Sequence, residues 1–261
     1  AITFDPHPIM LISPERAPKE LTSVERRIEL LIENGINHVR VLNFTPEMSR
    51  FTPEEFLRNV VVSQCSAQHV IVGENFRFGA KAAGDFAYLE DYGSLHGFTA
   101  ANQTLTGDAE VFSSTRVRQT LLEGDVETAA LVLGRLFAVE GIVVHGDHRG
   151  RELGFPTANI VVGERSATPA DGVYAGWLVP PDGQHLPAAI SVGANPTFEG
   201  VVNRRVEAHV LDREDLDLYG AHIEIEFIRH VREMKAFATV GELLTAMAKD
   251  IADTRDILGV T

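Results

Sequence analysis

The chain has little cysteine and no long apolar run, and each shortage excludes a class of protein. Among its 261 residues there is one cysteine, Cys65, so no disulfide can form within the chain and no thiolate cluster can hold zinc. We expect Cys65 to be a small buried apolar residue rather than a nucleophile. No stretch approaches the roughly 20 apolar residues of a membrane span, and no signal peptide precedes the first expected strand. The sequence therefore predicts a cytoplasmic protein with no membrane partner.

Positive charge is also scarce. The 23 Lys and Arg residues are outnumbered by 37 Asp and Glu residues, which gives a formal net charge of −14. Binding to nucleic acid needs clustered Lys and Arg that displace counterions, so we expect no nucleic-acid partner. ATP remains a candidate ligand, because backbone N–H groups, a few cations and Mg²⁺ are enough to hold its phosphates. The sequence leaves self-association into a homo-oligomer open.

The first half of the chain alternates strand-like and helix-like segments. We expect strands at residues 1–4, 38–42, 69–73 and 98–105, and helices that begin near Thr22, Thr52, Asp85, Ser114 and Asp125. The helix after Thr52 has proline at its first position and a glutamate, Glu55, placed to complete a capping box. Strands that alternate with helices predict a mostly parallel sheet with helices on both faces, over residues 1–133.

The pattern changes near residue 134. Strand-like segments at residues 137–144, 172–179, 188–192, 206–212 and 223–231 follow one another, separated by turns rich in glycine and proline. A final amphipathic helix is expected over residues 240–257. Consecutive strands without intervening helices predict a closed antiparallel β-barrel with a C-terminal helix, over residues 134–261.

A loop rich in glycine and arginine lies between the first two barrel strands. Glycine allows positive φ and close approach of the backbone to a ligand, as a phosphate-binding loop requires, although an ordinary glycine-rich turn has the same composition. The candidate ATP- and phosphate-binding residues are Gly146, Arg149, Gly150, Arg151, Gly154 and Pro156.

Thr157 and Asn159 follow this loop directly. Pro156 fixes the chain before Thr157, and the two side chains point the same way if residues 157–159 are extended. A hydroxyl and a carboxamide oxygen are hard oxygen ligands of the kind Mg²⁺ accepts beside water and phosphate oxygens. Thr157 and Asn159 are therefore candidate metal ligands.

The sequence Gly154-Phe155-Pro156-Thr157-Ala158-Asn159 resembles the signature of riboflavin kinases. Later segments of that family also occur here in order, at residues 172–176, 191–198, 206–209 and 217–220. The resemblance implies a six-stranded barrel in which Thr157 and Asn159 help to hold Mg²⁺ and the nucleotide. It also implies that Glu207 is the catalytic base, which takes the proton of the riboflavin 5′-hydroxyl as ATP is converted to ADP and riboflavin to FMN.

Glu207 and Arg232 each allow two interpretations. Glu207 lies on an alternating strand, where a solvated glutamate fits the local pattern as well as a base does, although phosphoryl transfer needs a carboxylate on the attacking hydroxyl. Arg232 borders the flavin site or forms a structural salt bridge.

The first half resembles the FAD synthetase (FMN adenylyltransferase) module of the bacterial bifunctional enzymes. The resemblance is carried by residues 4–8, 74–79 and 113–118. It implies a Rossmann-like nucleotidyltransferase domain over residues 1–133. Its flavin side would include Pro6, Pro8 and Asn75, and its phosphate side Ser114, Thr115 and Arg118. A helix start with serine and threonine can bind an anion, but an ordinary helix cap has the same sequence.

The sequence departs from that module in one respect. The family's G-x-F-D-G-x-H-x-G-H segment is absent, so we expect a truncated parallel sheet that lacks one βα unit of about 30 residues. The intact protein would then make FMN and FAD, and the chain as given FMN alone. Two alternatives stay open: a riboflavin kinase with a structural N-terminal domain, and a flavin-binding module without catalysis.

Overall fold

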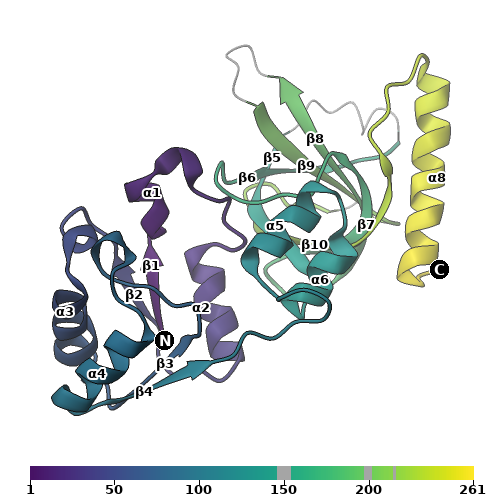
Figure 1. Cartoon of the computed structure of the whole chain (residues 1–261). Helices are drawn as coiled ribbons and strands as arrows, with labels where there is room; N and C mark the ends of the chain where they lie inside the picture. The colour runs from purple at the N-terminus through teal and green to yellow at the C-terminus, as the bar shows by residue number, and fades with distance from the viewer. Residues whose placement is uncertain (146–153, 197–201, 214–215) are drawn as a thin grey trace. The chain divides into compact units, whose positions relative to one another are not determined.

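The computed structural model describes residues 1–145, 154–196, 202–213 and 216–261. It divides into two compact units (Figure 1). The first comprises Ala1–Pro18 and Arg26–Val111, and the second Lys19–Glu25 and Phe112–Thr261. In the described part of the chain, no helix has the length and apolar character needed to cross a membrane.

The first unit contains two pairs of parallel strands. Strand β1 (Ile2–Asp5) pairs with β2 (Arg40–Asn43), and β3 (His69–Gly73) pairs with β4 (Thr99–Gln103). The helical segments are α1 (Pro8–Ile12), η1 (Pro14–Arg16), α2 (Val24–Glu33), η2 (Met48–Arg50), α3 (Pro53–Phe56), η3 (Leu57–Gln64), η4 (Ala80–Ala82) and α4 (Phe86–His96). The predicted parallel pairing is confirmed, but among the described residues it forms two separate two-stranded sheets rather than one.

Local sequence explains where helices of this unit begin. The Thr52 hydroxyl accepts a hydrogen bond from the Glu55 N–H at 3.2 Å, and the Glu55 carboxylate accepts one from the Thr52 N–H at 2.8 Å. The predicted capping box is thus confirmed. The Asp85 side chain caps α4 in a similar way, by accepting from the Tyr88 N–H at 3.0 Å.

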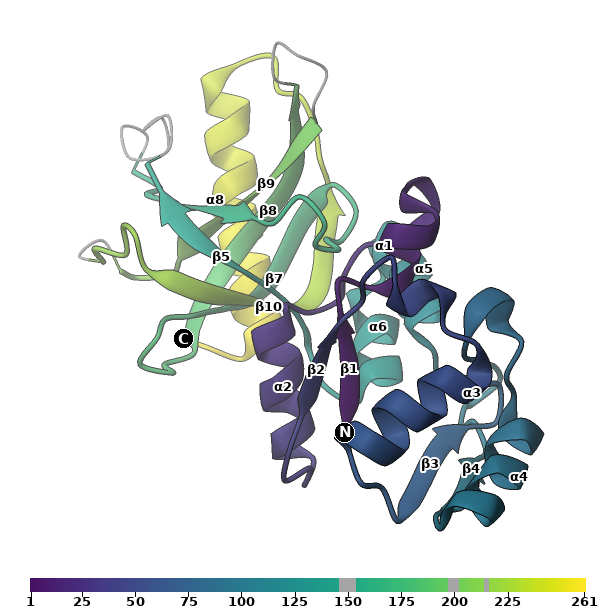
Figure 2. The ribbon, with the colours of Figure 1, turned by 90° about the vertical axis from the view of Figure 1, so that its left-hand side faces the viewer.

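The second unit is built on a closed six-stranded barrel, as predicted. Its strands are β5 (Phe137–Val144), β6 (Ala158–Val162), β7 (Gly172–Val179), β8 (Leu186–Pro196), β9 (Val202–Val210) and β10 (His222–Glu233), in the order β10-β5-β6-β9-β8-β7. All neighbouring strands are antiparallel. Helix α8 (Val240–Leu258) packs against β7, β8 and β10 (Figures 1 and 2).

The barrel interior is filled with large apolar side chains. Tyr174, Ile190, Ile225 and Phe227 are fully buried. Gly176 is required where β7 meets β10, because a Cβ there would collide with the carbonyl oxygen of Glu226. Since side chains alternate along a strand, the residues between these core positions face outward. Polar side chains are therefore expected on the outer face of the barrel.

Helices α5 (Ser114–Leu122) and α6 (Val126–Leu133) belong to the barrel unit. Their buried residues Val117, Leu121, Val126 and Ala129 join the same hydrophobic cluster as the barrel interior. Residues 19–25 also contact this unit, where Ser23 donates a hydrogen bond to Glu140 at 2.6 Å. The compact unit that holds the barrel is therefore larger than the predicted domain of residues 134–261.

Candidate functional site

A row of residues runs across the barrel wall from strand to strand. Asn159 of β6 lies opposite Glu207 of β9, and Glu207 lies opposite Ser191 of β8. Ser191 in turn pairs with Val173 of β7, which pairs with Arg232 of β10. Residues directly opposite one another on antiparallel strands have Cβ atoms about 5 Å apart on one face. The sheet thus brings the Glu207 carboxylate between a carboxamide and a hydroxyl.

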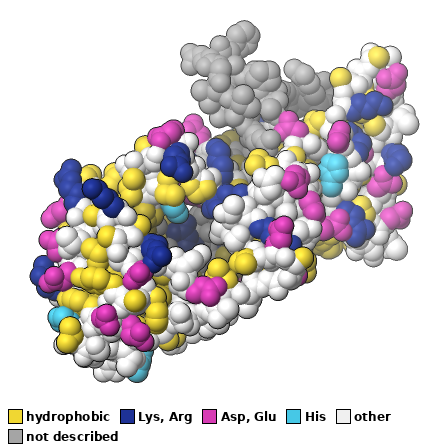
Figure 3. All heavy atoms as spheres, in the orientation of Figure 1, with side chains coloured by type: hydrophobic (Ala, Val, Ile, Leu, Met, Phe, Trp, Pro, Cys, Tyr) yellow, Lys and Arg dark blue, Asp and Glu magenta, His cyan; other side chains and the backbone are white. Residues whose placement is uncertain are grey.

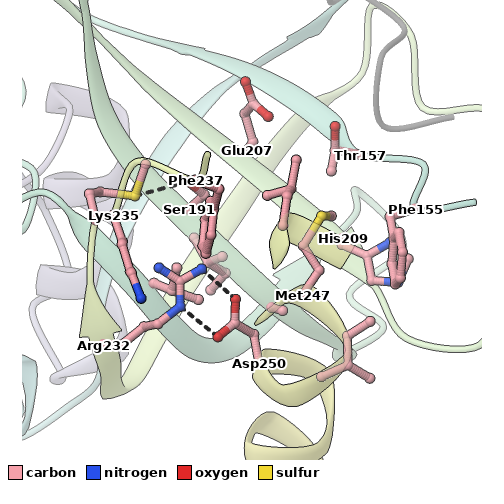
Figure 4. A pocket seen from close by; sticks show the side chains of 16 residues that line it. Phe155, Thr157, Ser191, Glu207, His209, Arg232, Lys235, Phe237, Met247 and Asp250 are labelled. Carbon is pink, nitrogen blue, oxygen red and sulfur yellow. Dashed lines mark hydrogen bonds and ion pairs between the residues drawn. The ribbon is translucent and has the colours of Figure 1, made fainter. Parts of the chain in front are cut away.

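A cavity of about 320 Å³ lies over this part of the wall, between the strands and α8 (Figure 4). Polar side chains from the strands, and from the residue just before β6, line one side of it, namely Thr157, Ser191, Glu207, His209 and Arg232. An apolar wall comes from the segment after β10 and from α8, with Met234, Phe237, Leu243, Met247 and Ile251. The cavity therefore combines a polar strand face with an apolar helical face, as sites for flat organic ligands usually do.

Thr157 and Glu207 lie at the same end of the cavity. Both line the cavity, and Figure 4 shows the Thr157 hydroxyl and the Glu207 carboxylate in its upper part. Asn159 is absent from the cavity lining, but it is the cross-strand neighbour of Glu207, and its amide nitrogen donates to the Thr157 carbonyl at 3.4 Å. That bond leaves the Asn159 carboxamide oxygen as an acceptor.

These oxygens fit Mg²⁺ by their chemistry. The Thr157 hydroxyl and the Asn159 carboxamide are both hard oxygen donors. Within the described residues no group of three or more His, Cys, Asp or Glu side chains could hold a metal ion. A cation beside Thr157 and Asn159 would thus take most of its ligands from water and phosphate, which is the usual manner of binding for Mg²⁺.

Arg232 borders the cavity and also forms an ion pair. Its Nε and Nη2 atoms each donate to the Asp250 carboxylate at 2.7 Å, so the pair is bidentate. Asp250 lies on α8 and is buried, and the Arg232 guanidinium lies 5.7 Å from the centre of the Phe237 ring. Arg232 thus forms the structural salt bridge, which joins α8 to β10, and it also lines the cavity; that the cavity holds flavin stays a prediction.

The sequence reasoning missed two kinds of residue at this site. His209 could have been found from the alternation of β9, because it lies two positions after Glu207 and so on the same face. Met247 lies on the apolar face of the expected amphipathic helix, but Asp250 had no comparable signal, because its pairing with Arg232 joins distant parts of the chain.

The glycine-rich loop can be placed only at its end. Gly154 has a φ of +85°, in the region that favours glycine, and the Pro156 carbonyl accepts a hydrogen bond from His209. The other predicted phosphate-binding residues lie outside the described residues; they are Gly146, Arg149, Gly150 and Arg151.

Candidate flavin-side residues of the N-terminal half flank the ends of two strands. Pro6 follows β1 after a cis peptide bond, and Pro8 is the first residue of α1, which the His7 side chain caps. Asn75 is exposed in the turn after β3. All three belong to the first compact unit.

Candidate phosphate-side residues lie on α5, in the second unit. Ser114 and Thr115 are exposed in its first turn, and the capping residue is Ser113, whose hydroxyl accepts from the Arg116 N–H at 3.2 Å. Arg118 donates its Nε to the Lys19 carbonyl at 2.6 Å, and burial lowers the pKa of its guanidinium. One Arg118 nitrogen is thus already used within the fold.

Two family models match the chain in the order of its halves. The model described as FAD synthetase matches residues 1–116, and the model described as riboflavin kinase matches residues 133–258. A riboflavin kinase barrel preceded by a FAD synthetase region defines the class of the protein as a flavin-modifying transferase.

Relatives of the whole chain carry both activities in their names. The bifunctional riboflavin kinase/FMN adenylyltransferase of Escherichia coli strain K12 is 35% identical over 259 residues, which are 99% of this chain and 82% of the relative. The enzyme of the same name from Pseudomonas fluorescens is 35% identical over 255 residues, covering 97% and 81%. The chain belongs to this family of bifunctional riboflavin kinase/FMN adenylyltransferases.

A solved structure has the same fold over nearly the whole chain. It is that of a protein from Streptococcus pneumoniae described as a macrolide-efflux protein. The two structures match with a TM-score of 0.85 at 29% identity, covering 97% of this chain and 82% of the other. The efflux description concerns the pneumococcal protein alone, and the likeness supports the fold of this chain.

Proposed function

We propose that the barrel unit transfers the γ-phosphate of ATP to the 5′-hydroxyl of riboflavin and so makes FMN. The observation that carries the proposal is the position of Glu207, which lines a cavity with an apolar far wall together with Thr157 and has Asn159 as its cross-strand neighbour. A binding module without catalysis has no need of a carboxylate beside two candidate metal ligands.

In this proposal Glu207 is the base. Its carboxylate accepts the proton of the flavin hydroxyl as that oxygen attacks the γ-phosphorus, and ADP leaves from the opposite side. Ser191, directly opposite Glu207 on β8, is placed to orient the hydroxyl or the carboxylate. Phosphoryl transfer depends mainly on such positioning, because the protein makes no covalent bond with the substrate.

Thr157 and Asn159 are proposed to hold Mg²⁺, with Gly154 and Pro156 at the ATP side of the loop. Mg²⁺ held by these residues would neutralise charge on the phosphate oxygens. The apolar wall formed by Phe237 and Met247 suits the flat flavin ring, and Arg232 borders it.

The N-terminal half is proposed to carry the FMN adenylyltransferase activity. The domains would be residues 1–133 for this activity and residues 134–261 for the kinase. Pro6, Pro8 and Asn75 would contact flavin, and Ser114, Thr115 and Arg118 the nucleotide phosphates; the exposed first turn of α5 supports the phosphate assignment. A cytoplasmic location, the absence of a nucleic-acid partner and the oligomeric state stay predictions.

The experiment is an incubation of the chain with riboflavin, ATP and Mg²⁺, followed by chromatographic separation of the flavins. The proposed kinase produces FMN, whereas riboflavin recovered unchanged would favour the binding module. The same chromatogram tests the second activity, because FAD is the product of the proposed adenylyltransferase. Omission of ATP is the control.

A further inference from the structure

His209 contacts the polypeptide segment that carries Thr157, on the far side of the strand from the barrel core. Ala208 of β9 is the cross-strand partner of Ala158, the first residue of β6. Because the strands are antiparallel, His209, which follows Ala208, comes opposite Thr157, which precedes Ala158. The ladder ends there, because Pro156 has no N–H to donate. The Pro156 carbonyl instead accepts a hydrogen bond from Nδ1 of His209 at 2.8 Å.

The chemistry of that bond determines which ring nitrogen of His209 carries a proton. A carbonyl oxygen only accepts, so Nδ1 of His209 must carry the proton, in the neutral ring as in the charged one. The ring also has Phe155 at its edge, with centroids 5.7 Å apart and planes at 67°. His209 thus contacts both residues that precede Thr157, and it lines the same cavity as Thr157 and Glu207 (Figure 4).

We propose that His209 is a positioning residue for Mg²⁺–nucleotide binding, which acts by fixing the Pro156–Thr157 peptide through its Nδ1–H. The inference rests on the proposed kinase function. The Pro156 carbonyl and the Thr157 nitrogen belong to one planar peptide, so a bond to the carbonyl limits rotation of the unit that sets the direction of the Thr157 hydroxyl. Among the described residues, the pairing of β6 with β9 begins only at Ala158, two positions after Pro156.

Three substitutions separate this role from others. His209→Ala removes the donor. His209→Asn keeps it, because the amide nitrogen of Asn is attached to Cγ as Nδ1 is in histidine, whereas His209→Gln places its amide nitrogen one atom further out. His222→Ala is the matched control, since His222 is an exposed histidine at the start of β10.

The measurement is the affinity for ADP by calorimetry on the full chain, once with saturating Mg²⁺ and once with EDTA. Loss of one hydrogen bond predicts about fivefold weaker Mg²⁺–ADP binding for His209→Ala and His209→Gln. His209→Asn and His222→Ala are expected within about twofold of the parent. In EDTA all variants are expected to bind ADP alike, and circular dichroism checks that each is folded.

Other outcomes overturn the inference. Parent-like Mg²⁺–ADP affinity in His209→Ala would show that the peptide needs no such support. An equal loss of ADP affinity with and without Mg²⁺ would show that His209 does not act through the metal. Weaker riboflavin binding with unchanged Mg²⁺–ADP affinity would show that His209 contacts the flavin instead. The proposed function fails separately, if the parent chain itself makes no FMN.

Discussion

Glu207 is the residue on which the proposed chemistry depends most directly. It is the one carboxylate in the strand row Asn159–Glu207–Ser191, and it reaches the cavity while Asn159 does not line it. A base that takes a proton in the transition state affects turnover more than substrate binding.

Replacement of Glu207 by glutamine is therefore expected to lower the kcat for FMN formation by roughly 100-fold or more. Glutamine has the same shape but does not accept a proton, so the melting temperature and the affinity for Mg²⁺–ADP should stay near those of the parent. Glu164→Gln, at an exposed turn, is the control. A Glu207→Gln variant with near-normal kcat would remove Glu207 from the mechanism.

Helix α8 contributes to the site through its attachment to β10. Asp250 is a buried carboxylate whose two oxygens are both bonded to Arg232, and the helix positions Met247 and Ile251 in the cavity wall. The ion pair therefore connects the stability of the helix with the shape of the cavity.

Asp250→Ala is expected to destabilise the protein by on the order of 3 kcal/mol, because it leaves Arg232 charged and without its carboxylate. The KM for riboflavin should also rise. Asp253→Ala is the matched control: Asp253 pairs with Lys249 at the surface of the same helix, where such pairs are worth about 0.3–0.5 kcal/mol. Equal effects of the two substitutions in chemical denaturation would contradict the importance of the Arg232 pair.

The end of α8 is bonded to the turn after β9 by a second ion pair. Arg255 donates to Asp212 at 2.5 Å, and this bond lowers the pKa of the Asp212 carboxyl. Because the folded pKa is below the unfolded one, the stabilisation is present above the unfolded pKa of about 3.9 and is lost as the pH falls through the folded value.

Asp212→Asn should therefore lower the melting temperature at pH 6, and this effect should diminish as the pH falls through the folded pKa and the parent carboxyl becomes protonated. Asparagine suits the comparison, because Asp212 has a positive φ of 57°, which asparagine tolerates. Melting curves from pH 2 to 7 measure the difference, and a pH-independent difference would show that the charge has no part in it.

At the scale of the whole molecule, the barrel is stabilised by residues that precede it in the chain. Helices α5 and α6 add Val117, Leu121, Val126 and Ala129 to its core, and residues 19–25 contact its surface. On the face shown in Figure 3, acidic and basic side chains are interspersed over the described residues rather than gathered by sign.

A fragment of residues 112–261 is expected to be more stable than one of residues 134–261. The shorter fragment exposes the surface that the two helices cover, and each fully buried valine or leucine is worth about 1.5–3 kcal/mol. Both fragments lack residues 19–25, so the comparison is matched. Urea unfolding measures the difference, and equal unfolding midpoints would show that α5 and α6 do not stabilise the barrel.

The sequence by itself determined the kinds of element and their order. Consecutive strands without intervening helices predicted the barrel, and the Thr52 capping box predicted the start of α3. These features depend on residues a few positions apart, whose hydrogen bonding and side-chain periodicity are local properties.

Only the tertiary structure decided which distant groups share the site. The pairing of Arg232 with Asp250, the bond from His209 to the Pro156 carbonyl and the docking of α5 and α6 on the barrel join residues far apart in the chain. Such contacts depend on strand register and helix docking, which are set by the packing of the whole core, and no short segment encodes them.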